Sequence, residues 1–193
     1  MSKKVSLVIG GSKGIGSVIS KCLKSRGDDV YILSRNNNNK NYFIKGDLFD
    51  EKNLKISLGK RFKNKKIDNL VFSQRYRGDS WLDEFKVSLF SVESIIKFLK
   101  NKFNKNASVV IISSVANKTI LHDQPSQYHI TRGALEHLVR YYAVLFGKSK
   151  IRFNCIMPTK IIKPENKNFF NKSSKGIKIK KLIKKITPLN QMG

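Results

Sequence analysis

The chain has 193 residues, of which 40% are hydrophobic, and it carries a formal net charge of +26 at pH 7. This length and apolar content suffice for a single domain spanning residues 1–193, and no uninterrupted apolar run is long enough to cross a membrane. Its two cysteines are too few for a disulfide framework and no secretory leader is expected, so a cytoplasmic protein is favoured.

The lysines that produce the positive charge are dispersed along the chain rather than gathered in one segment. The sequence lacks the arginine-rich pattern interleaved with aromatic residues that is typical of proteins binding single-stranded nucleic acid. We therefore interpret the charge as solvated surface and expect no specific nucleic-acid partner.

Short β-branched or apolar runs alternate with stretches of helical periodicity, which predicts βαβ units and a parallel sheet of the α/β class. The expected strands are Val5–Ile9, Val30–Ser34, Tyr42–Lys45, Asn69–Phe72, Ser108–Ser113 and Arg152–Met157. The expected helices are Ile15–Arg26, Glu51–Arg61, Trp81–Phe103 and Ser126–Phe146. Gly27 and Gly147 directly follow two of these helices and are expected to form left-handed caps.

A glycine-rich turn follows the first expected strand and opens the first expected helix. Glycine permits a tight turn and lets the backbone approach a phosphate closely. The helix N-terminus then offers unpaired N–H groups and the positive end of its dipole to a pyrophosphate. In this strand–turn–helix context the motif indicates dinucleotide binding, and the candidate contacts are Gly10, Ser12, Lys13, Gly14, Ile15 and Gly16.

The end of the second expected strand indicates which nicotinamide cofactor is bound. An acidic residue about 20 positions after the glycines would bind the ribose 2′-hydroxyl of NAD, but this chain has Ser34 and Arg35 there. Arginine can pair with a 2′-phosphate through a bidentate fork, and Lys13 can add a second cation. NADP(H) is therefore favoured over NAD(H). Asp47, after the third strand, is a candidate for the adenine edge, and capping of the next helix is the alternative.

Ser114, Tyr128 and Arg132 form the candidate catalytic set. Tyr128 and Arg132 are four residues apart on an expected helix, so they share one face. An ordinary tyrosine has a pKa of about 10, and a cation one turn away favours the phenolate that acid/base catalysis near neutral pH requires. Ser114 ends the fifth strand, where it can hydrogen-bond a substrate oxygen. These residues indicate proton transfer beside a hydride acceptor, and a core tyrosine beside a surface arginine is the alternative.

Residues 160–193 form a lysine-rich C-terminal segment, which is expected to hold a substrate loop and a helix of the same domain. Apolar residues recur at helical spacing among the lysines of this segment, at Ile179, Leu182, Ile183 and Ile186. This pattern predicts a basic amphipathic helix. Packing on the protein's own core is favoured over binding to a membrane or a partner, because lysine stems readily cover the rim of such a face.

Taken together, these motifs make the chain similar to the short-chain dehydrogenase/reductase family from about Val5 to Gly193. The glycine turn matches the family's TGxxxGxG pattern, Ser114 and Tyr128 match its catalytic serine and tyrosine, and Ile151–Pro158 resembles its IRVNxxxPG segment. The resemblance implies a Rossmann-type doubly wound parallel sheet with helices on both faces and homo-oligomers that assemble through a helical interface. It also implies hydride transfer between NAD(P)(H) and a small carbonyl or alcohol substrate, no metal, and cofactor contacts from Ser73, Tyr128, Arg132 and Pro158.

Several family positions carry other residues in this chain. The usual catalytic lysine is Arg132, the active-site asparagine aligns with Ser88, and the NNAG motif is replaced by Phe72-Ser73-Gln74-Arg75. The family usually continues past the segment that here reads Pro188-Leu189-Asn190-Gln191-Met192-Gly193. The last strand of the family's sheet is therefore expected to be missing, which would leave Arg152–Met157 as an exposed edge.

Three interpretations are compatible with these residues. The first is an NADP(H)-dependent reductase in which Ser114 orients the carbonyl, Tyr128 donates the proton, and Arg132 tunes Tyr128 and holds the ribose. The second is a catalytically degenerate relative that binds a nucleotide or a partner without turnover. The third is a surface binder that acts through the basic residues 172–185. Arg75 and Arg77 are interpreted as solvated loop cations, and recognition of an acidic substrate such as a sugar acid or acyl carrier is the alternative.

Overall fold

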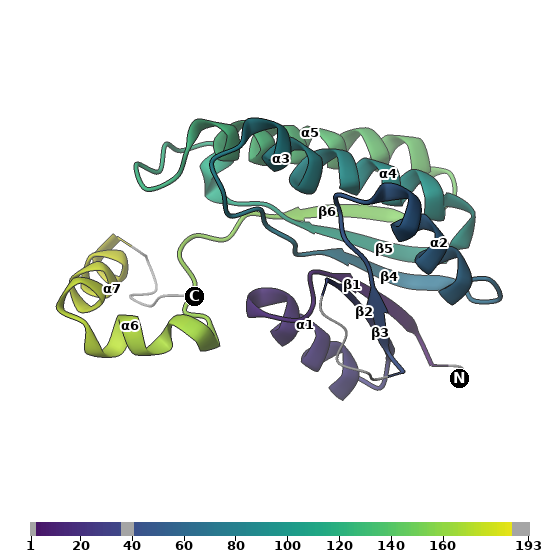
Figure 1. Cartoon of the computed structure of the whole chain (residues 1–193), viewed down its shortest axis with the longest axis horizontal. Helices are drawn as coiled ribbons and strands as arrows, with labels where there is room; N and C mark the ends of the chain where they lie inside the picture. Colours follow the sequence, from purple (N-terminus) through teal and green to yellow (C-terminus); the bar gives the residue numbers. More distant parts are fainter. Residues whose placement is uncertain (1–2, 36–40, 187–193) are drawn as a thin grey trace. The chain divides into compact units, whose positions relative to one another are not determined.

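The computed structural model describes residues 3–35 and 41–186 of the chain (Figure 1). It divides into two compact units, Met1–Ile156 and Met157–Gly193. The first unit contains the sheet, and the second contains the lysine-rich segment. The expectation that both belong to one domain remains a prediction.

A six-stranded parallel sheet forms the centre of the first unit, with the strand order β3-β2-β1-β4-β5-β6. The order reverses between β1 and β4, and such a switch point is where open α/β sheets bind ligands at the carboxyl ends of their strands. The predicted parallel α/β sheet is confirmed, and β6 is an edge strand within the described residues. The strand bounds are β1 Val5–Ile9, β2 Asp29–Ser34, β3 Phe43–Lys45, β4 Ile67–Phe72, β5 Phe103–Ile112 and β6 Arg152–Ile156.

Helices cover both faces of the sheet, as a doubly wound fold requires (Figure 1). Side chains alternate between the faces along each strand. Leu7 and Ile9 of β1 join the larger core, which α2, α4 and α5 cover, whereas Val8 joins the smaller core beneath α1. The bounds are α1 Gly14–Ser25, α2 Glu51–Arg61, α3 Trp81–Phe85, the π-helical turn η1 Lys86–Phe90, α4 Ser91–Leu99, the 3-10 turn η2 Lys100–Lys102, the 3-10 turn η3 Val115–Asn117 and α5 Ser126–Gly147.

The single helix predicted over Trp81–Phe103 is wrong in two respects. It is divided into α3, η1 and α4, and the hydroxyl of Ser91 donates to the carbonyl of Val87 inside the wide turn. Phe103 is 8% exposed and pairs with Ile67 as the first residue of β5, rather than ending a helix. Phe103 continues the helical spacing of the apolar residues before it, but in the structure its buried side chain belongs to strand β5.

The two glycine caps have different outcomes. Gly27 has a φ of +95° and ends α1 in the left-handed region, as predicted. Gly147 was predicted to act in the same way, and this is wrong because it lies inside α5 and has no positive φ. The left-handed residue there is Lys150, with a φ of 57° and an N–H that donates to the Gly147 carbonyl.

The second unit holds two helices, α6 Lys167–Lys172 and α7 Ser174–Ile186, after the 3-10 turn η4 Pro164–Asn166. The predicted amphipathic helix is present as α7, and the Ser173 hydroxyl accepts a hydrogen bond from the N–H of Gly176 at its start. Phe170 of α6 is buried. Across the described residues, no helix combines the length and the apolar character that a membrane span requires.

Candidate active site

The loops after β1 and β4 meet at the carboxyl edge of the sheet. The N–H of Gly10 donates to the Leu33 carbonyl at 3.0 Å, and the N–H of Ser73 donates to the Ile9 carbonyl at 2.9 Å. The chain leaving β1 is thus held between β2 and β4. This arrangement places the glycine turn at the switch point of the sheet.

The glycine turn has the geometry that only glycine permits. Gly10 and Gly14 have φ values of +75° and +55°, in the left-handed region. A Cβ atom on Gly16 would lie 2.4 Å from the Gly10 carbonyl oxygen, and one on Gly10 would lie 2.8 Å from the backbone nitrogen of Gln74. The turn, the helix start and the Ser73–Gln74 backbone are therefore packed too closely for any side chain.

The N-terminus of α1 is open to an anion. Its N-cap residue, Lys13, makes no side-chain capping hydrogen bond, and the first turn of the helix contains no acidic residue. The N–H groups of Gly14, Ile15 and Gly16 are the unpaired donors that such a helix start provides. Ser12 and Lys13 are exposed beside them. These residues fit the pyrophosphate of a dinucleotide, because they form a side-chain-free cradle at a positive helix end.

The predicted cofactor-selecting residues lie at the ends of the next strands. Ser34 ends β2, where its carbonyl accepts from the N–H of Gly46, and Arg35 follows it with an exposed side chain. Asp47 accepts a hydrogen bond from the N–H of Phe49. The alternative that Asp47 caps the next helix is wrong, because Asp50 accepts from the N–H of Asn53 at the start of α2. Pro158 belongs to the second unit, so its contact with the cofactor remains a prediction.

Tyr128 and Arg132 lie on one buried face of α5, as predicted. Their exposed fractions are 8% and 3%, and the guanidinium carbon of Arg132 lies 4.8 Å from the centroid of the Tyr128 ring. The end of β5 is tied to this helix because the Ser113 hydroxyl donates to the Arg132 carbonyl at 3.0 Å. Ser114 follows in the chain, and its Oγ accepts from the N–H of Ala116 at 3.2 Å. That bond leaves its hydroxyl proton for another acceptor.

Arg132 is held by an acidic residue that the sequence reasoning did not identify. Its Nη2 lies 2.9 Å from the Glu84 carboxylate, and the two side chains are 3% and 4% exposed. Thr131 donates to the same carboxylate oxygen at 2.8 Å, and Arg132 also donates to the hydroxyl of Ser88. Ser88 is thus brought to the site, and it contacts the guanidinium. The Nε of Arg132 is buried without a hydrogen-bond partner among the described residues.

Arg75 is more than a solvated loop cation. Its guanidinium carbon lies 4.7 Å from the centroid of the Tyr128 ring, and its Nη2 donates to the side-chain oxygen of Gln124. The loop that carries Arg75 is also tied to α5, because the Gln127 amide donates to the Asp79 carbonyl at 3.1 Å. Two arginines from different elements therefore lie over one tyrosine ring.

Two residues of the site, Glu84 and Gln124, were not predicted from the sequence, and only Glu84 had a signal that could have identified it. Glu84 lies four positions before Ser88 in a segment predicted as helix, and residues at this spacing share one helix face, so the spacing was a signal that could have paired the two. A buried arginine also demands an acidic or polar partner, which makes a nearby glutamate a candidate. Gln124 had no such signal, because its loop carries no pattern that predicts its distance from Arg75.

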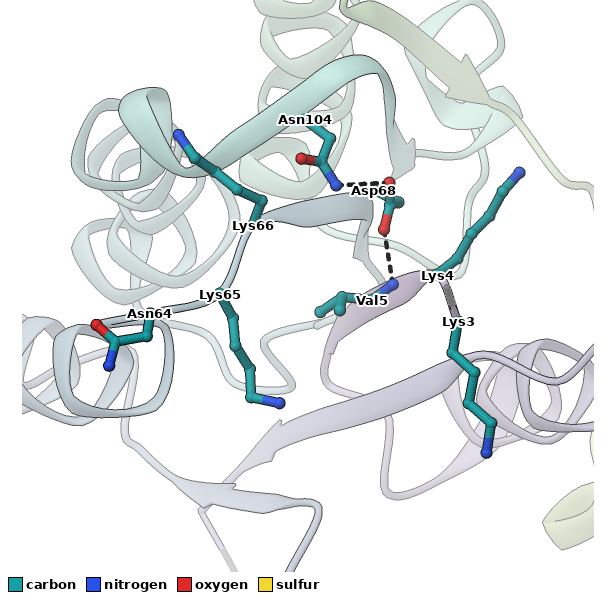
Figure 2. Close-up of a pocket in the computed structure, with 8 residues that line it drawn as sticks. All are labelled: Lys3, Lys4, Val5, Asn64, Lys65, Lys66, Asp68 and Asn104. Atoms are coloured by element: carbon teal, nitrogen blue, oxygen red, sulfur yellow. Dashed lines mark hydrogen bonds between the residues drawn. The ribbon is translucent and has the colours of Figure 1, made fainter. Parts of the chain in front are cut away.

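A cavity of about 430 Å³ lies elsewhere, at the amino ends of β1, β4 and β5. Figure 2 shows that its four lysines point in different directions. Asp68 in its wall is already paired, because it accepts from the N–H of Val5 at 2.7 Å and from Asn104 at 2.8 Å. This cavity is at the edge opposite the glycine turn, so it is not the candidate active site.

The arrangement at the carboxyl edge combines three chemical capabilities. Tyr128 supplies an acid/base hydroxyl, Ser114 supplies a hydrogen-bond donor, and Arg132 supplies a buried cation over the ring. Burial raises the pKa of the Cys155 thiol, which disfavours Cys155 as a thiolate nucleophile. The described residues contain no group of three or more His, Cys, Asp or Glu side chains able to hold a metal ion. Acid/base chemistry is what these side chains can perform.

The comparison with protein families gives one match over most of the chain. A family described as enoyl-(acyl carrier protein) reductase matches residues 70–193. A tropinone reductase homolog of Arabidopsis thaliana is 35% identical over 86 residues, which cover 45% of this chain and 30% of that protein. The L-fucose dehydrogenase of Mus musculus is 25% identical over 185 aligned residues, which cover 84% of this chain and 67% of the relative.

The fold is shared with solved structures. A short chain dehydrogenase from Leptospira borgpetersenii with bound NAD+ superposes with a TM-score of 0.78 at 24% sequence identity. The superposition covers 100% of this chain and 81% of that structure. The chain thus spans less than a third of the plant relative it matches, and most of the solved bacterial one.

Proposed function

This chain belongs to the short-chain dehydrogenase/reductase family, and from that premise we propose that it is an oxidoreductase that transfers hydride between a nicotinamide cofactor and a small carbonyl or alcohol. The observation that supports this most is the Tyr128 ring beneath the buried guanidinium of Arg132. This pair lies on α5, which is tied to the end of β5, and the glycine turn follows β1 at the same edge of the sheet.

The glycine turn would hold the pyrophosphate through the N–H groups at the start of α1. Ser73, Tyr128, Arg132 and Pro158 would contact the nicotinamide side, and Asp47 the adenine. When bound, the nicotinamide supplies a hydride to the substrate carbon or accepts one from it.

In the reducing direction, Ser114 donates a hydrogen bond to the carbonyl oxygen and orients it. The π electrons of the carbonyl move to this oxygen, which takes a proton from the Tyr128 hydroxyl. Arg132 keeps a fixed positive charge over the ring, but it cannot itself give up a proton. In the oxidising direction, Tyr128 takes the proton from the substrate alcohol.

We propose NADP(H) as the preferred cofactor, because Arg35 follows β2 where an NAD-binding chain carries an acidic residue. Replacing Arg35 with serine is expected to weaken NADPH binding by about 10- to 100-fold through loss of a charge-assisted pair, and to affect NADH much less. Titration of both cofactors by fluorescence at near-physiological salt measures this difference. The matched control is Arg77→Ser. If Arg35→Ser weakens the binding of NADPH and NADH equally, Arg35 contributes only general positive charge and does not select the cofactor.

We also propose that the chain assembles with copies of itself through the outer faces of α4 and α5. Large apolar side chains are exposed along α5, namely Ile130, Tyr141, Val144 and Leu145. Such a stripe is typical of a helical interface. Val144, which is 83% exposed, is the clearest point to test.

The substitution Val144→Glu is expected to convert the assembly to monomers, because it would bury an unpaired carboxylate in the interface. Light scattering coupled to size-exclusion chromatography measures the mass. Ile120→Glu is the control, since Ile120 is 74% exposed but lies outside both helices. A wild-type protein that is monomeric, or a Val144→Glu variant that still assembles, would contradict the proposed interface.

One observation supports the second candidate, a catalytically degenerate relative that binds a nucleotide or a partner. The Nη2 of Arg132 already donates to Glu84 and Ser88, which draws the guanidinium toward the core. A protein of this kind would bind a nicotinamide cofactor and yet show no turnover. Its Tyr128→Phe variant would then show the same absence of turnover as the wild type.

A further inference from the structure

Arg75 stands between the cofactor turn and the candidate catalytic tyrosine. The residue before it, Gln74, packs its backbone against Gly10, where a Cβ atom would lie 2.8 Å from the Gln74 nitrogen. Arg75 itself extends to the Tyr128 ring, with 4.7 Å between the guanidinium carbon and the ring centroid. A substrate oriented by Tyr128 would therefore be within reach of this side chain.

The position of the Arg75 guanidinium is set by a neutral partner. Gln124 donates its own amide N–H to the Asp123 carbonyl at 2.6 Å, which turns its side-chain oxygen toward Arg75. Within residues 3–35 and 41–186, no carboxylate pairs with Arg75. Arg132 differs in this respect, since Glu84 neutralises it. Among the residues that the structure describes, Arg75 is thus a cation at the tyrosine without a compensating carboxylate.

We propose that Arg75 binds an anionic group of the substrate, a carboxylate or a phosphate, and so selects an acidic carbonyl compound or hydroxy acid. The proposal rests on the proposed oxidoreductase function, because Tyr128 defines the reacting end of the substrate. A guanidinium that lies over an aromatic ring keeps edge N–H groups for a bidentate pair with an anion. Arg77, two residues further on, is exposed and has no ion pair or hydrogen bond among the described residues, so it provides a matched control.

Two pairs of aldehydes test the proposal, each pair differing only in the anionic group. The first is 4-carboxybenzaldehyde against its methyl ester, and the second is glyceraldehyde 3-phosphate against glyceraldehyde. The ratio of kcat/KM for the charged and neutral aldehyde is measured for the wild type, Arg75→Gln and Arg77→Gln at about 0.15 M salt, which screens the general attraction of a basic protein.

The wild type is expected to favour the charged member of at least one pair by about 10- to 100-fold, the range of one charge-assisted bidentate contact. Arg75→Gln should bring that ratio close to one, whereas Arg77→Gln should retain it. The pair that responds distinguishes a carboxylate from a phosphate. An unchanged ratio in Arg75→Gln, or a wild-type preference for the neutral aldehydes, would overturn the proposal.

Calorimetric titration of 4-carboxybenzaldehyde and its methyl ester with NADP+ present separates this inference from the proposed function, because NADP+ cannot reduce an aldehyde and, unlike glyceraldehyde, these two compounds carry no alcohol group to oxidise. A preference for the charged aldehyde that depends on Arg75, with no turnover under any condition, would overturn the oxidoreductase function and retain the anion site. Turnover without an Arg75-dependent preference would do the reverse. The absence of both turnover and charge preference would overturn both proposals.

Discussion

Replacing Tyr128 with phenylalanine is expected to lower the kcat of carbonyl reduction by about 100- to 10,000-fold, the range that general acid catalysis contributes. The change removes one hydroxyl from a ring that is already 92% covered by its surroundings, as its 8% exposure implies. The fold and the guanidinium positions over the ring should therefore persist. The rate is followed by the loss of NADPH absorbance with an aldehyde substrate.

The matched control is Tyr141→Phe, which removes a hydroxyl from an exposed ring on the same helix. This variant should keep the wild-type rate and affinity for NADPH, and Tyr128→Phe should still bind NADPH, because the glycine turn at the other end of the cofactor is unchanged. A rate that survives in Tyr128→Phe would show that another group carries the proton, and the catalytic assignment would fail. Cofactor binding without turnover in the wild type would favour the degenerate relative instead.

Replacing Glu84 with leucine is expected to lower the free energy of unfolding by about 3 to 5 kcal/mol, because it leaves the charge of Arg132 buried and unpaired. Arg132→Met should lower the free energy of unfolding by a similar amount, because it leaves the negative charge of Glu84 buried and unpaired. The double variant Glu84→Leu/Arg132→Met should recover most of the loss, since a buried ion pair and an apolar pair of similar volume are close in stability. Urea denaturation at pH 7 measures all four proteins.

The control for this cycle is Lys97→Met, which removes the exposed ion pair with Glu93 on α4. We expect its unfolding curve to match that of the wild type within error, because solvent screens such a pair. If the two single losses simply add in the double variant, Glu84 and Arg132 are not coupled. That result would contradict the conclusion that Glu84 holds the Arg132 guanidinium in place.

The buried pair gives a physical reason for the arginine at the family's lysine position. A guanidinium is planar and has several donors, so it can pair with Glu84, donate to Ser88 and still lie over the Tyr128 ring. A lysine ammonium is a compact charge on a flexible stem and cannot span these partners in the same way. Arg132 and Glu84 are therefore best regarded as one unit.

Local pattern was sufficient to predict much of this protein. Alternating apolar runs and helical stretches predicted all six strands in order, because strand and helix periodicities are properties of short segments. The glycine turn was identifiable for the same reason, since Gly10 and Gly14 need conformations that only their own backbone determines. Tyr128 and Arg132 were predicted on one face because they are one helical turn apart.

Contacts between distant segments could not be predicted in this way. The partner of Arg132, Glu84, lies 48 residues away in the sequence, and the contact between Arg75 and Gln124 spans 49 residues. Phe103 was predicted as the last residue of a helix but belongs to β5. Its place in the strand depends on its pairing with Ile67, which is distant in the sequence. Local periodicity carries no information about which helix will face which loop.

The sequence by itself thus determined the α/β class, the strand order along the chain, the glycine turn and the tyrosine–arginine face, because each depends on neighbouring residues. Only the tertiary structure decided the charges at that tyrosine. It neutralised Arg132 with Glu84 and left Arg75 without an acidic partner among the described residues. The physical reason is that a side chain's charge is known from its identity, whereas its compensation depends on what the fold packs against it.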